Sequence, residues 1–311
     1  MITIPDKIMS MKEAIKKLVH DESFVFFGGF GNGMSFSAAH EIIRQNLRNL
    51  KVTKCGGGIM FDQLIGAGVT NQIVTSHCWN GTGPQPAYNL RRAMEEGIPQ
   101  KIIYNEQSLF MINMSFFAGY MGIPFVPIRS VVGTGIYDHP KEVGLKAARV
   151  KCPFTGEEIC VVPAINPDVG FIQVQRADSE GNAQLWGLIG DTKYGINACE
   201  KIIVAAEEIV DKKVIMESPE RTIVGAHKVD AVILEPWGAH PSSMQGFYYT
   251  DLEYRFNYAK ETKTIEDWEH WLEKWVTGIE NRQEYLKVLG EDKMKFLNAK
   301  PIIQGAVNYG Y

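Results

Sequence analysis

Short apolar runs that end in glycine, each followed by a segment with helical spacing, recur along most of this chain. Residues Ser23–Gly28 are almost all apolar and lead into Gly28-Gly-Phe-Gly-Asn-Gly33, after which residues 35–47 have helical spacing. A strand buried on both faces of a parallel sheet has this character. The same order returns near Gly56–Gly58 and before a further strand at 72–76. This alternation predicts βαβ units and therefore an α/β fold on a largely parallel sheet.

The glycine-rich turns are the expected functional positions, because ligands of open parallel sheets bind at the carboxyl ends of the strands. These turns are Gly28–Gly33, Gly56–Gly58, His77–Gly83 and Gly133–Gly135. The first one follows a strand and precedes a helix, so its amides are suited to a phosphate or a developing oxyanion. It lacks the glycine spacing of the dinucleotide fingerprint and the lysine of a Walker loop. A purely structural tight turn is the alternative.

Composition excludes several classes of protein. The chain has 311 residues, of which 45% are hydrophobic and 22% charged, as in an ordinary globular protein. The net charge of -4 gives no electrostatic reason to expect a nucleic acid or an anionic membrane as partner. The five scattered cysteines form no CxxC pair, and no apolar stretch approaches the roughly 20 residues of a membrane span. We expect a cytoplasmic protein.

Two further segments have a distinct apolar pattern. Residues 108–121 predict a helix closed by Gly122, and because apolar residues surround nearly all of it, we expect it to be buried. Residues 159–174 predict two buried strands separated by the turn Asn166-Pro-Asp168. The strand pattern continues to about residue 235, so the sheet should end there.

The C-terminal part differs in composition from the rest. An aromatic-rich segment precedes a helix in which Trp268, Trp271 and Trp275 share one face, with Thr264 and Asp267 as a plausible cap. This stripe predicts packing against the chain's own core, and a subunit interface is the alternative. We therefore expect an α/β domain at 1–245 and a helical C-terminal extension at 246–311 packed on the same domain.

Single polar residues in or near the turns are candidates for a site. The hydroxyl of Thr82, between two glycines, can donate and accept, and Arg129 can clamp a carboxylate or phosphate with its planar fork. Glu106, after an apolar run, is either a carboxylate facing the ligand cleft or a simple acid near a helix N-terminus. Each of these residues has an ordinary surface role as its alternative. The histidines, including His77 and His240, have no triad or ligand spacing, so they predict no hydrolase triad and no metal site.

Four ordered motifs together resemble the alpha subunits of class I coenzyme A transferases. They are Gly28-Gly-Phe-Gly31, Ala118-Gly-Tyr-Met-Gly-Ile-Pro-Phe125, Pro163-Ala-Ile-Asn-Pro-Asp-Val169 and Ala177-Asp-Ser-Glu-Gly-Asn182. The stretch from Val229 to Ser242 resembles the alpha subunits of glutaconate CoA-transferases in particular. The resemblance covers nearly the whole chain and implies an open α/β/α sandwich of the CoA-transferase, ribose-phosphate isomerase-like type with a helical C-terminal extension.

The resemblance also implies a function. Such an alpha subunit forms the acyl-binding side of an active site shared with a beta-type subunit, in a heterotetramer or a larger assembly. A beta-subunit glutamate attacks acyl-CoA and becomes a glutamyl-CoA thioester, which a second carboxylic acid then accepts. Coenzyme A enters as a substrate, no metal is needed, and the chain alone should be inactive. The implied substrate-binding residues are Gly29, Phe30, Gly31, Thr82, Arg129, Gly133, Thr134 and Gly135.

Two departures from the family pattern leave the reaction open. The loop after Gly31 lacks the arginine of the glutaconate pattern, which predicts a less acidic or larger acyl group. Glu106 resembles instead the steroid-ring hydrolase branch of the superfamily, so a CoA-thioester ring hydrolase or a decarboxylase that uses Glu106 is the alternative. Glu180 is interpreted as a turn acid and not as the nucleophile. A sugar-phosphate-binding module is a third possibility, based on fold likeness alone.

Overall fold

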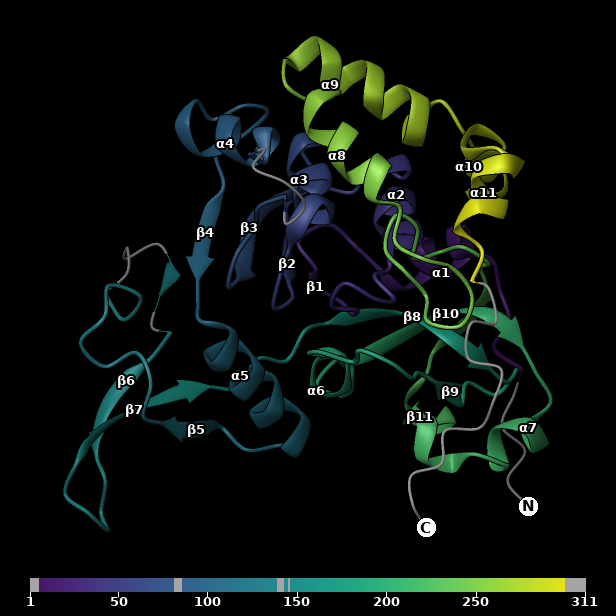
Figure 1. Cartoon of the computed structure of the whole chain (residues 1–311). Helices are drawn as coiled ribbons and strands as arrows, with labels where there is room; N and C mark the ends of the chain where they lie inside the picture. Colours follow the sequence, from purple (N-terminus) through teal and green to yellow (C-terminus); the bar gives the residue numbers. More distant parts are fainter. Residues whose placement is uncertain (1–5, 81–85, 139–142, 145, 300–311) are drawn as a thin grey trace.

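A computed structural model of the chain describes residues 6–80, 86–138, 143–144 and 146–299. Its main feature is a largely parallel nine-stranded sheet with helices on both faces (Figure 1). This confirms the predicted open α/β/α sandwich. One end of the sheet follows chain order outward from its centre, with β1 (Phe24–Phe27), β2 (Leu50–Thr53), β3 (Thr70–Thr75) and β4 (Ile103–Glu106).

The other half of the sheet comes from the second part of the chain. On the far side of β1 lies β8 (Val169–Ala177), which also pairs with β10 (Lys201–Ile209), and β10 pairs with β12 (Ala231–Leu234). These pairings are all parallel, whereas β9 (Ala183–Gln184) and β11 (Thr222–Val224) add antiparallel strands beside β8. The last strand ends at Leu234, which confirms the predicted end of the sheet.

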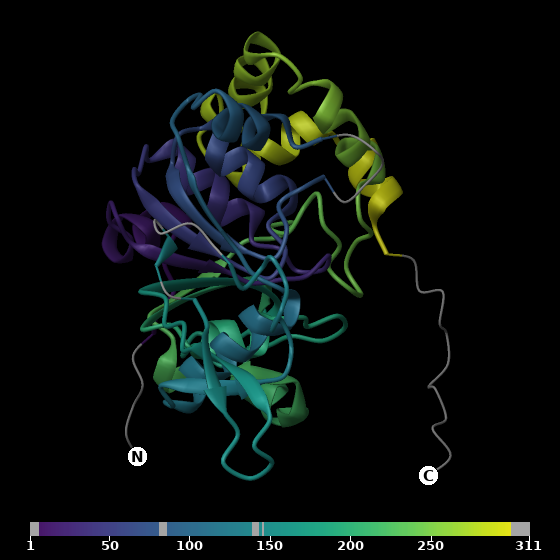
Figure 2. The same cartoon turned by 90° about the vertical axis from the view of Figure 1, so that its left-hand side faces the viewer.

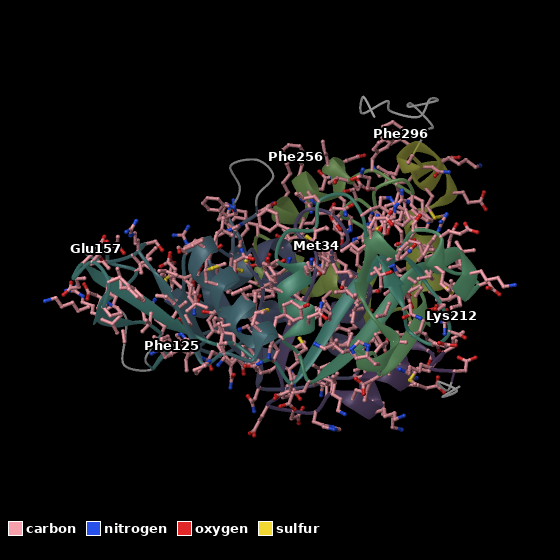
Figure 3. The ribbon with its side chains drawn as sticks, turned by 90° about the horizontal axis from the view of Figure 1, so that it is seen from below. Met34, Phe125, Glu157, Lys212, Phe256 and Phe296 are labelled. Carbon is pink, nitrogen blue, oxygen red and sulfur yellow. The ribbon has the colours of Figure 1, made fainter. Side chains whose placement is uncertain are left out.

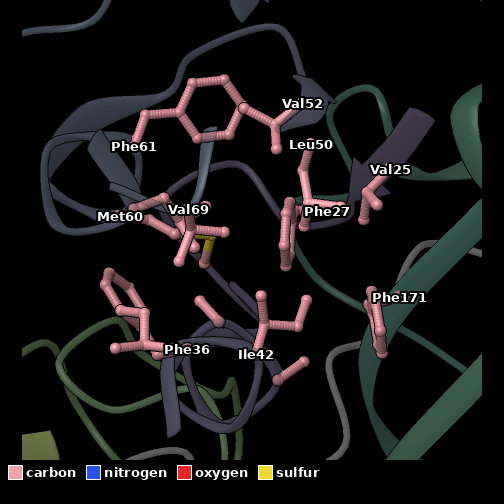
Figure 4. Packing of buried hydrophobic residues seen from close by; sticks show 14 of the residues in the cluster. Val25, Phe27, Phe36, Ile42, Leu50, Val52, Met60, Phe61, Val69 and Phe171 are labelled. Carbon is pink, nitrogen blue, oxygen red and sulfur yellow. The ribbon is translucent and has the colours of Figure 1, made fainter. Parts of the chain in front are cut away.

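Helices before and between the first strands cover one face. They are α1 (Met11–Leu18), α2 (Phe36–Arg44), α3 (Gly58–Gly66) and α4 (Tyr88–Glu95). The first begins at Ser10, where Ser10 and Glu13 form a reciprocal capping box that satisfies two backbone amides. Beneath these helices, Phe27 stacks on Phe171 at a centroid distance of 5.5 Å, while Phe36 and Ile42 of α2 pack from the helix layer (Figure 4). The central parallel strands β1 and β8 are therefore buried.

The opposite face carries α5 (Leu109–Met121) and α6 (Thr192–Asn197), with α7 (Lys212–Met216) and two short 3₁₀ turns, η2 (Pro219–Arg221) and η3 (Ala226–Lys228). The prediction that α5 is buried all round is wrong. Ser108 and Gly122 cap it as expected, and Ile112 and Phe116 are fully buried, but Phe110 is 51% and Met121 is 54% exposed. Only one face of this helix contacts the sheet, so the other presents apolar side chains at the surface.

A second, smaller sheet extends beyond β4. It contains β5 (Phe125–Ile128), β6 (Ala148–Lys151) and β7 (Glu158–Pro163) in the antiparallel order β5-β7-β6, and it projects from the main body (Figures 1 and 2). The prediction of two strands in 159–174 is confirmed, but they belong to different sheets. Buried and exposed residues alternate along β7, so the prediction that both strands are buried is wrong for this one.

Four helices follow the sheet and lie over the face that α1–α4 cover (Figure 1). They are α8 (Leu252–Lys260), α9 (Ile265–Leu272), which runs into a π-helical turn η4 (Glu273–Thr277), α10 (Arg282–Leu289) and α11 (Glu291–Leu297). The cap formed by Thr264 and Asp267 is confirmed. Trp268, Trp271 and Trp275 belong to the same hydrophobic cluster as the sheet, which confirms the prediction that they pack on the chain's own core. The division of the chain at residue 245 stays a prediction.

The tryptophan stripe should account for a large share of the free energy of unfolding. Trp271 is 3% exposed and stacks on Trp268 at a centroid distance of 5.3 Å. We predict that Trp271→Ala lowers the free energy of unfolding by about 3 to 5 kcal/mol, because it opens a cavity in the shared core. Denaturant unfolding measures this, with the same change at Trp79, which is 62% exposed, as the control. Equal losses at both positions would contradict this assignment.

Candidate active site

Three turns from neighbouring strands meet at the carboxyl ends of β1, β2 and β3. Together with residues from later segments they line a cleft of about 310 Å³. The lining residues are Phe30, Gly31, Met34, Gly56, Gly58, Ile59, His77, Trp79, Asn80, Leu188 and Arg255. The strands after β1 extend the sheet in one direction and the strands from β8 extend it in the other, so the first turn lies at a topological switch point. Open parallel sheets bind ligands at such a position.

A larger cleft of about 550 Å³ lies elsewhere, between α1, α2, the end of β12 and α10. Glu41, Arg44 and Arg282 are among its lining residues. None of the glycine-rich turns that follow β1, β2 and β3 contributes to it. We therefore place the candidate site in the smaller cleft, where the backbone amides are accessible.

The Gly28–Gly33 turn has a conformation that only glycine adopts easily. Gly29 has φ of +94°, and a Cβ atom there would lie 2.4 Å from the carbonyl oxygen of Gly33. The amide of Gly29 donates to Oγ1 of Thr192 at 2.8 Å and already has an acceptor within the chain, so its role in substrate binding stays a prediction. Within the described part of the chain, the amides of Phe30 and Gly31 have no hydrogen-bond acceptor. These two amides remain able to bind an anionic oxygen.

A buried pair of opposite charges supports this turn from below. Lys54 follows β2, is fully buried, and donates from Nζ to the carbonyl oxygen of Gly29. Asp191 is 1% exposed and accepts from the amide of Cys55 at 2.6 Å. Burial lowers the pKa of Lys54 and raises that of Asp191, and in each case the charge of the other residue opposes the shift. This pair was not singled out from the sequence, because no pattern joins positions 54 and 191.

His77 lines the cleft, although its spacing predicted a structural role. Its Nδ1 lies 3.0 Å from Oγ of Ser76, and its ring packs against Trp79 at a centroid distance of 5.3 Å. Burial, together with the nearby charge of Lys54, lowers the pKa of His77. The imidazole is therefore neutral at neutral pH and can donate or accept one hydrogen bond at the cleft. The sequence signal for this residue was its position in the turn after β3, at the end of the sheet where ligands are expected to bind.

The opposite wall of the cleft comes from distant segments. Leu188 follows β9 and is 56% exposed, and Arg255 lies on α8. The carbonyl oxygen of Arg255 accepts a hydrogen bond of 3.1 Å from Nδ2 of Asn80, which ties α8 to the turn after β3. Sequence analysis did not identify either wall residue, because both lie outside the glycine-rich turns.

Other predicted substrate-binding residues lie away from this cleft. Arg129 forms a salt bridge of 3.1 Å with Glu157 in the small sheet, and its side chain is 77% exposed. Glu157 lies at one end of the molecule, far from Met34 of the cleft (Figure 3). In the exposed loop after β5, which contains Gly133 and Gly135, the amide and hydroxyl of Thr134 both donate to the carbonyl oxygen of Val131. Their role in substrate binding stays a prediction, and Thr82 lies outside the described residues.

Glu106 is the last residue of β4 and is exposed. It lies opposite Thr75 in the register of β3 and β4, one strand away from the turn that carries His77. Its carbonyl oxygen accepts a hydrogen bond from Nζ of Lys146. Its side chain is not part of the cleft lining, so any catalytic use would need a substrate that extends toward β4.

Two other features are absent from the parts of the chain that the structure describes. No group of three or more His, Cys, Asp or Glu side chains there is arranged to hold a metal ion. Nor is any described helix both long enough and apolar enough to span a membrane.

Comparison with known proteins agrees with the fold. The model of the Coenzyme A transferase family matches residues 8–235, which include the main sheet and the turns that line the site. The chain belongs to the coenzyme A transferase family. The family resemblance of the four sequence motifs is thereby confirmed.

Within this family the chain is similar to several A-type subunits. It is 32% identical to the A-type subunit of 3-oxoadipate CoA-transferase from Pseudomonas knackmussii, over 92% of this chain and 99% of that protein. It is 30% identical to the A-type subunit of glutaconate CoA-transferase from Acidaminococcus fermentans, over 95% of both chains. A cholesterol ring-cleaving hydrolase IpdA subunit of Rhodococcus jostii is 24% identical, over 90% of this chain and 95% of that one.

A solved structure gives the same result. A chain in the crystal structure of glutaconate coenzyme A-transferase from Acidaminococcus fermentans superposes with a TM-score of 0.87, over 95% of this chain and 96% of that one. The two chains are 30% identical over this region. The shared architecture therefore extends into the helical C-terminal part, beyond the region that the family model covers.

The buried pair beneath the glycine turn leads to a prediction for this CoA-transferase family member. Lys54→Met removes the cation that donates to the Gly29 carbonyl and leaves Asp191 buried without its opposing charge. We expect the free energy of unfolding to fall by about 3 to 5 kcal/mol.

A double-mutant cycle in denaturant unfolding checks this coupling. Lys54→Met combined with Asp191→Asn should cost clearly less than the sum of the two single changes, because neither charge is then left alone in the interior. Strictly additive losses would show that the two residues do not interact, and would contradict the pairing.

Proposed function

We propose that this chain is the alpha subunit of an acyl-CoA:carboxylate CoA-transferase of the glutaconate and 3-oxoadipate type. In this proposal it forms the acyl-binding side of an active site that a beta-type subunit completes. The observation that carries the proposal is the cleft at the switch point of the sheet, where the amides of Phe30 and Gly31 have no acceptor among the described residues. The two transferase relatives support it, since each is named as one of two kinds of subunit, which implies a partner.

The chemistry of the cleft supports the need for a partner. Its lining residues include amides, an imidazole, a guanidinium and apolar side chains, but no carboxylate, hydroxyl or thiol among the described residues. Covalent CoA transfer requires a nucleophile, and in this proposal a carboxylate of another chain supplies it. Trp79 and Leu188 leave large apolar surfaces exposed at the cleft, which is typical of a protein–protein contact.

The proposed roles follow from the bond changes in the reaction. A beta-subunit glutamate carboxylate attacks the thioester carbonyl carbon, and the carbonyl π electrons move to the oxygen. The amides of Phe30 and Gly31 are the donors we assign to this oxyanion, and one well-placed donor contributes about 2.7 to 4 kcal/mol. The neutral imidazole of His77 is available as a further donor. The rigid support from Lys54 and Thr192 keeps the turn from reorganising as charge develops.

Coenzyme A enters this scheme as part of a substrate, and we expect its body to contact mainly the partner. The carboxylic acid that leaves and the one that enters share the acyl cleft of this chain. We expect a heterotetramer or a larger assembly, and we expect the chain alone to be inactive because the nucleophile is missing.

Purification of the tagged chain with its native partner tests the proposal. We predict that a beta-type subunit copurifies, and that incubation with acyl-CoA converts one of its glutamates to a CoA thioester, because the carboxylate nucleophile is regenerated only after a second acid accepts CoA. Mass spectrometry of the partner detects this adduct, and borohydride reduction traps it. A complex that hydrolyses acyl-CoA and never forms the adduct would rule out the transferase assignment.

A CoA-thioester ring hydrolase or decarboxylase that uses Glu106 is the second candidate. The similarity to the ring-cleaving hydrolase subunit supports it, as does the exposed carboxylate at the end of β4. Glu106 then acts as general base or acid on a substrate that extends from the cleft across the end of β3.

Glu106→Gln separates the two candidates, because it removes the carboxylate while preserving the shape of the side chain. Under the transferase proposal the turnover number of the complex changes by less than about threefold, whereas general acid–base catalysis predicts a loss of about 10² to 10⁴. Steady-state kinetics of the complex measures this, with Glu95→Gln on the exposed side of α4 as the matched control.

A further inference from the structure

Arg255 lines the candidate cleft, and its positive charge is unpaired among the described residues. Within that part of the chain its buried Nε atom has no hydrogen-bond partner, and its Nη2 atom makes only a weak contact of 3.9 Å with the sulfur of Met34. No described carboxylate lies within salt-bridge distance of its guanidinium. Burial lowers the pKa of Arg255, and no opposite charge offsets this effect. Arg255 is partly buried, and a partly buried cation without a protein partner is unfavourable, which favours a ligand as its partner.

Lys54 is a second cation near this point, and Asp191 opposes its charge. The charges of Lys54 and Arg255 are close enough for Arg255 to lower the pKa of Lys54. The ammonium of Lys54 in turn contributes to the lowered pKa of His77. The neighbouring acid, Asp191, is held below the turn by the amide of Cys55. Arg255 is therefore the cation of the cleft whose charge is not compensated by a described residue, and its guanidinium is well shaped to bind a carboxylate in a bidentate manner.

The rest of the cleft limits what this anion can be. Met34, Ile59 and Leu188 line it with apolar surface, while the amides of Phe30 and Gly31 provide separate donors. A short chain with a polar group at each end matches this arrangement. The volume of about 310 Å³ is at the lower end of ligand sites, which suits a small acyl group.

We propose that Arg255 is a specificity-determining residue that binds the distal carboxylate of a dicarboxylic acyl group. This rests on the proposed function, which places the reacting carbonyl at the Phe30 and Gly31 amides. The reacting carboxylate becomes a neutral thioester during CoA transfer, whereas a distal carboxylate stays charged in both the acid and its CoA ester. The permanent charge of Arg255, which is partly buried, is therefore better matched to the distal group.

This assignment changes the expectation drawn from the loop after Gly31. That loop lacks an arginine, which predicted a less acidic acyl group. Arg255 offers a cation from α8, a different element of the fold, to the same cleft. Selection for an acidic acyl group consequently needs no arginine in the loop.

Direct binding of acids to the intact complex with the partner subunit tests the proposal. Glutarate and adipate are the dicarboxylate probes, and butyrate and hexanoate are the monocarboxylate probes, all titrated by calorimetry. We expect the wild-type complex to bind the diacids more tightly than the monoacids. Arg255→Met should weaken diacid binding about ten- to hundredfold and change monoacid binding by less than about threefold.

Two further variants serve as controls. Arg255→Lys keeps the charge but loses the planar fork, so we expect an intermediate loss that is again confined to the diacids. Arg91→Met makes the same change as Arg255→Met at an exposed position of α4 and should alter neither class of probe. Because Arg255 has no described salt-bridge partner, Arg255→Met should not lower the melting temperature of the complex. If the Arg255→Met complex does not assemble, Arg255→Lys provides the test: a loss confined to the diacids supports the assignment, and unchanged diacid binding contradicts it.

Three results would overturn the assignment. An equal loss for both probe classes would mean that Arg255 binds the reacting carboxylate. Unchanged diacid binding in Arg255→Met, or a wild-type complex without preference for diacids, would mean that Arg255 binds no distal carboxylate. The proposed function is tested separately, by CoA transfer to an acid. A complex that transfers CoA to no acid would contradict the proposed function, whatever its preference in the binding measurement.

Discussion

The turn after β1 depends on hydrogen bonds that hold it on both sides. This strand is central in the sheet, between β2 and β8, so the chain must leave it within a crowded layer. Glycine at position 29 permits the backbone to double back against Gly33, and Thr192 and Lys54 then bind the amide and the carbonyl oxygen of Gly29. With these two groups fixed, the next two amides are left without an acceptor among the described residues, at the cleft. The geometry of the candidate site follows from this one constraint.

The electrostatics of the site follow from the same arrangement. Lys54 is close to a backbone carbonyl and to the charge of Asp191, so its own charge is compensated inside the protein. Arg255 has no such compensation among the described residues. The difference separates a structural cation from one that is available to a ligand. The tryptophan cluster fixes the C-terminal helices, one of which carries Arg255. This packing holds the wall of the cleft in place.

Much of the fold was predictable because it depends on local patterns. Apolar runs followed by glycine-rich turns identified β1 and β2, and Thr264 with Asp267 identified the start of α9. Prediction failed where burial depends on distant neighbours. Helix α5 is apolar all round, yet part of it is exposed at the surface. Strand β7 belongs to the small sheet and not to the main one. Nothing in either segment specifies which elements cover it.

The sequence alone determined the class of fold, the end of the sheet at which we place the candidate site, and the family. These depend on periodicity, on glycine positions and on ordered motifs, all of which are local properties. Only the tertiary structure decided which polar groups meet there. It brought Arg255 and Leu188 to a cleft with His77, took Gly29 out of the set of free donors, and left Arg129 in a distant sheet. The reason is physical: a site on a parallel sheet is assembled across strands and helices that are far apart in the chain, and their contacts form only when the core packs.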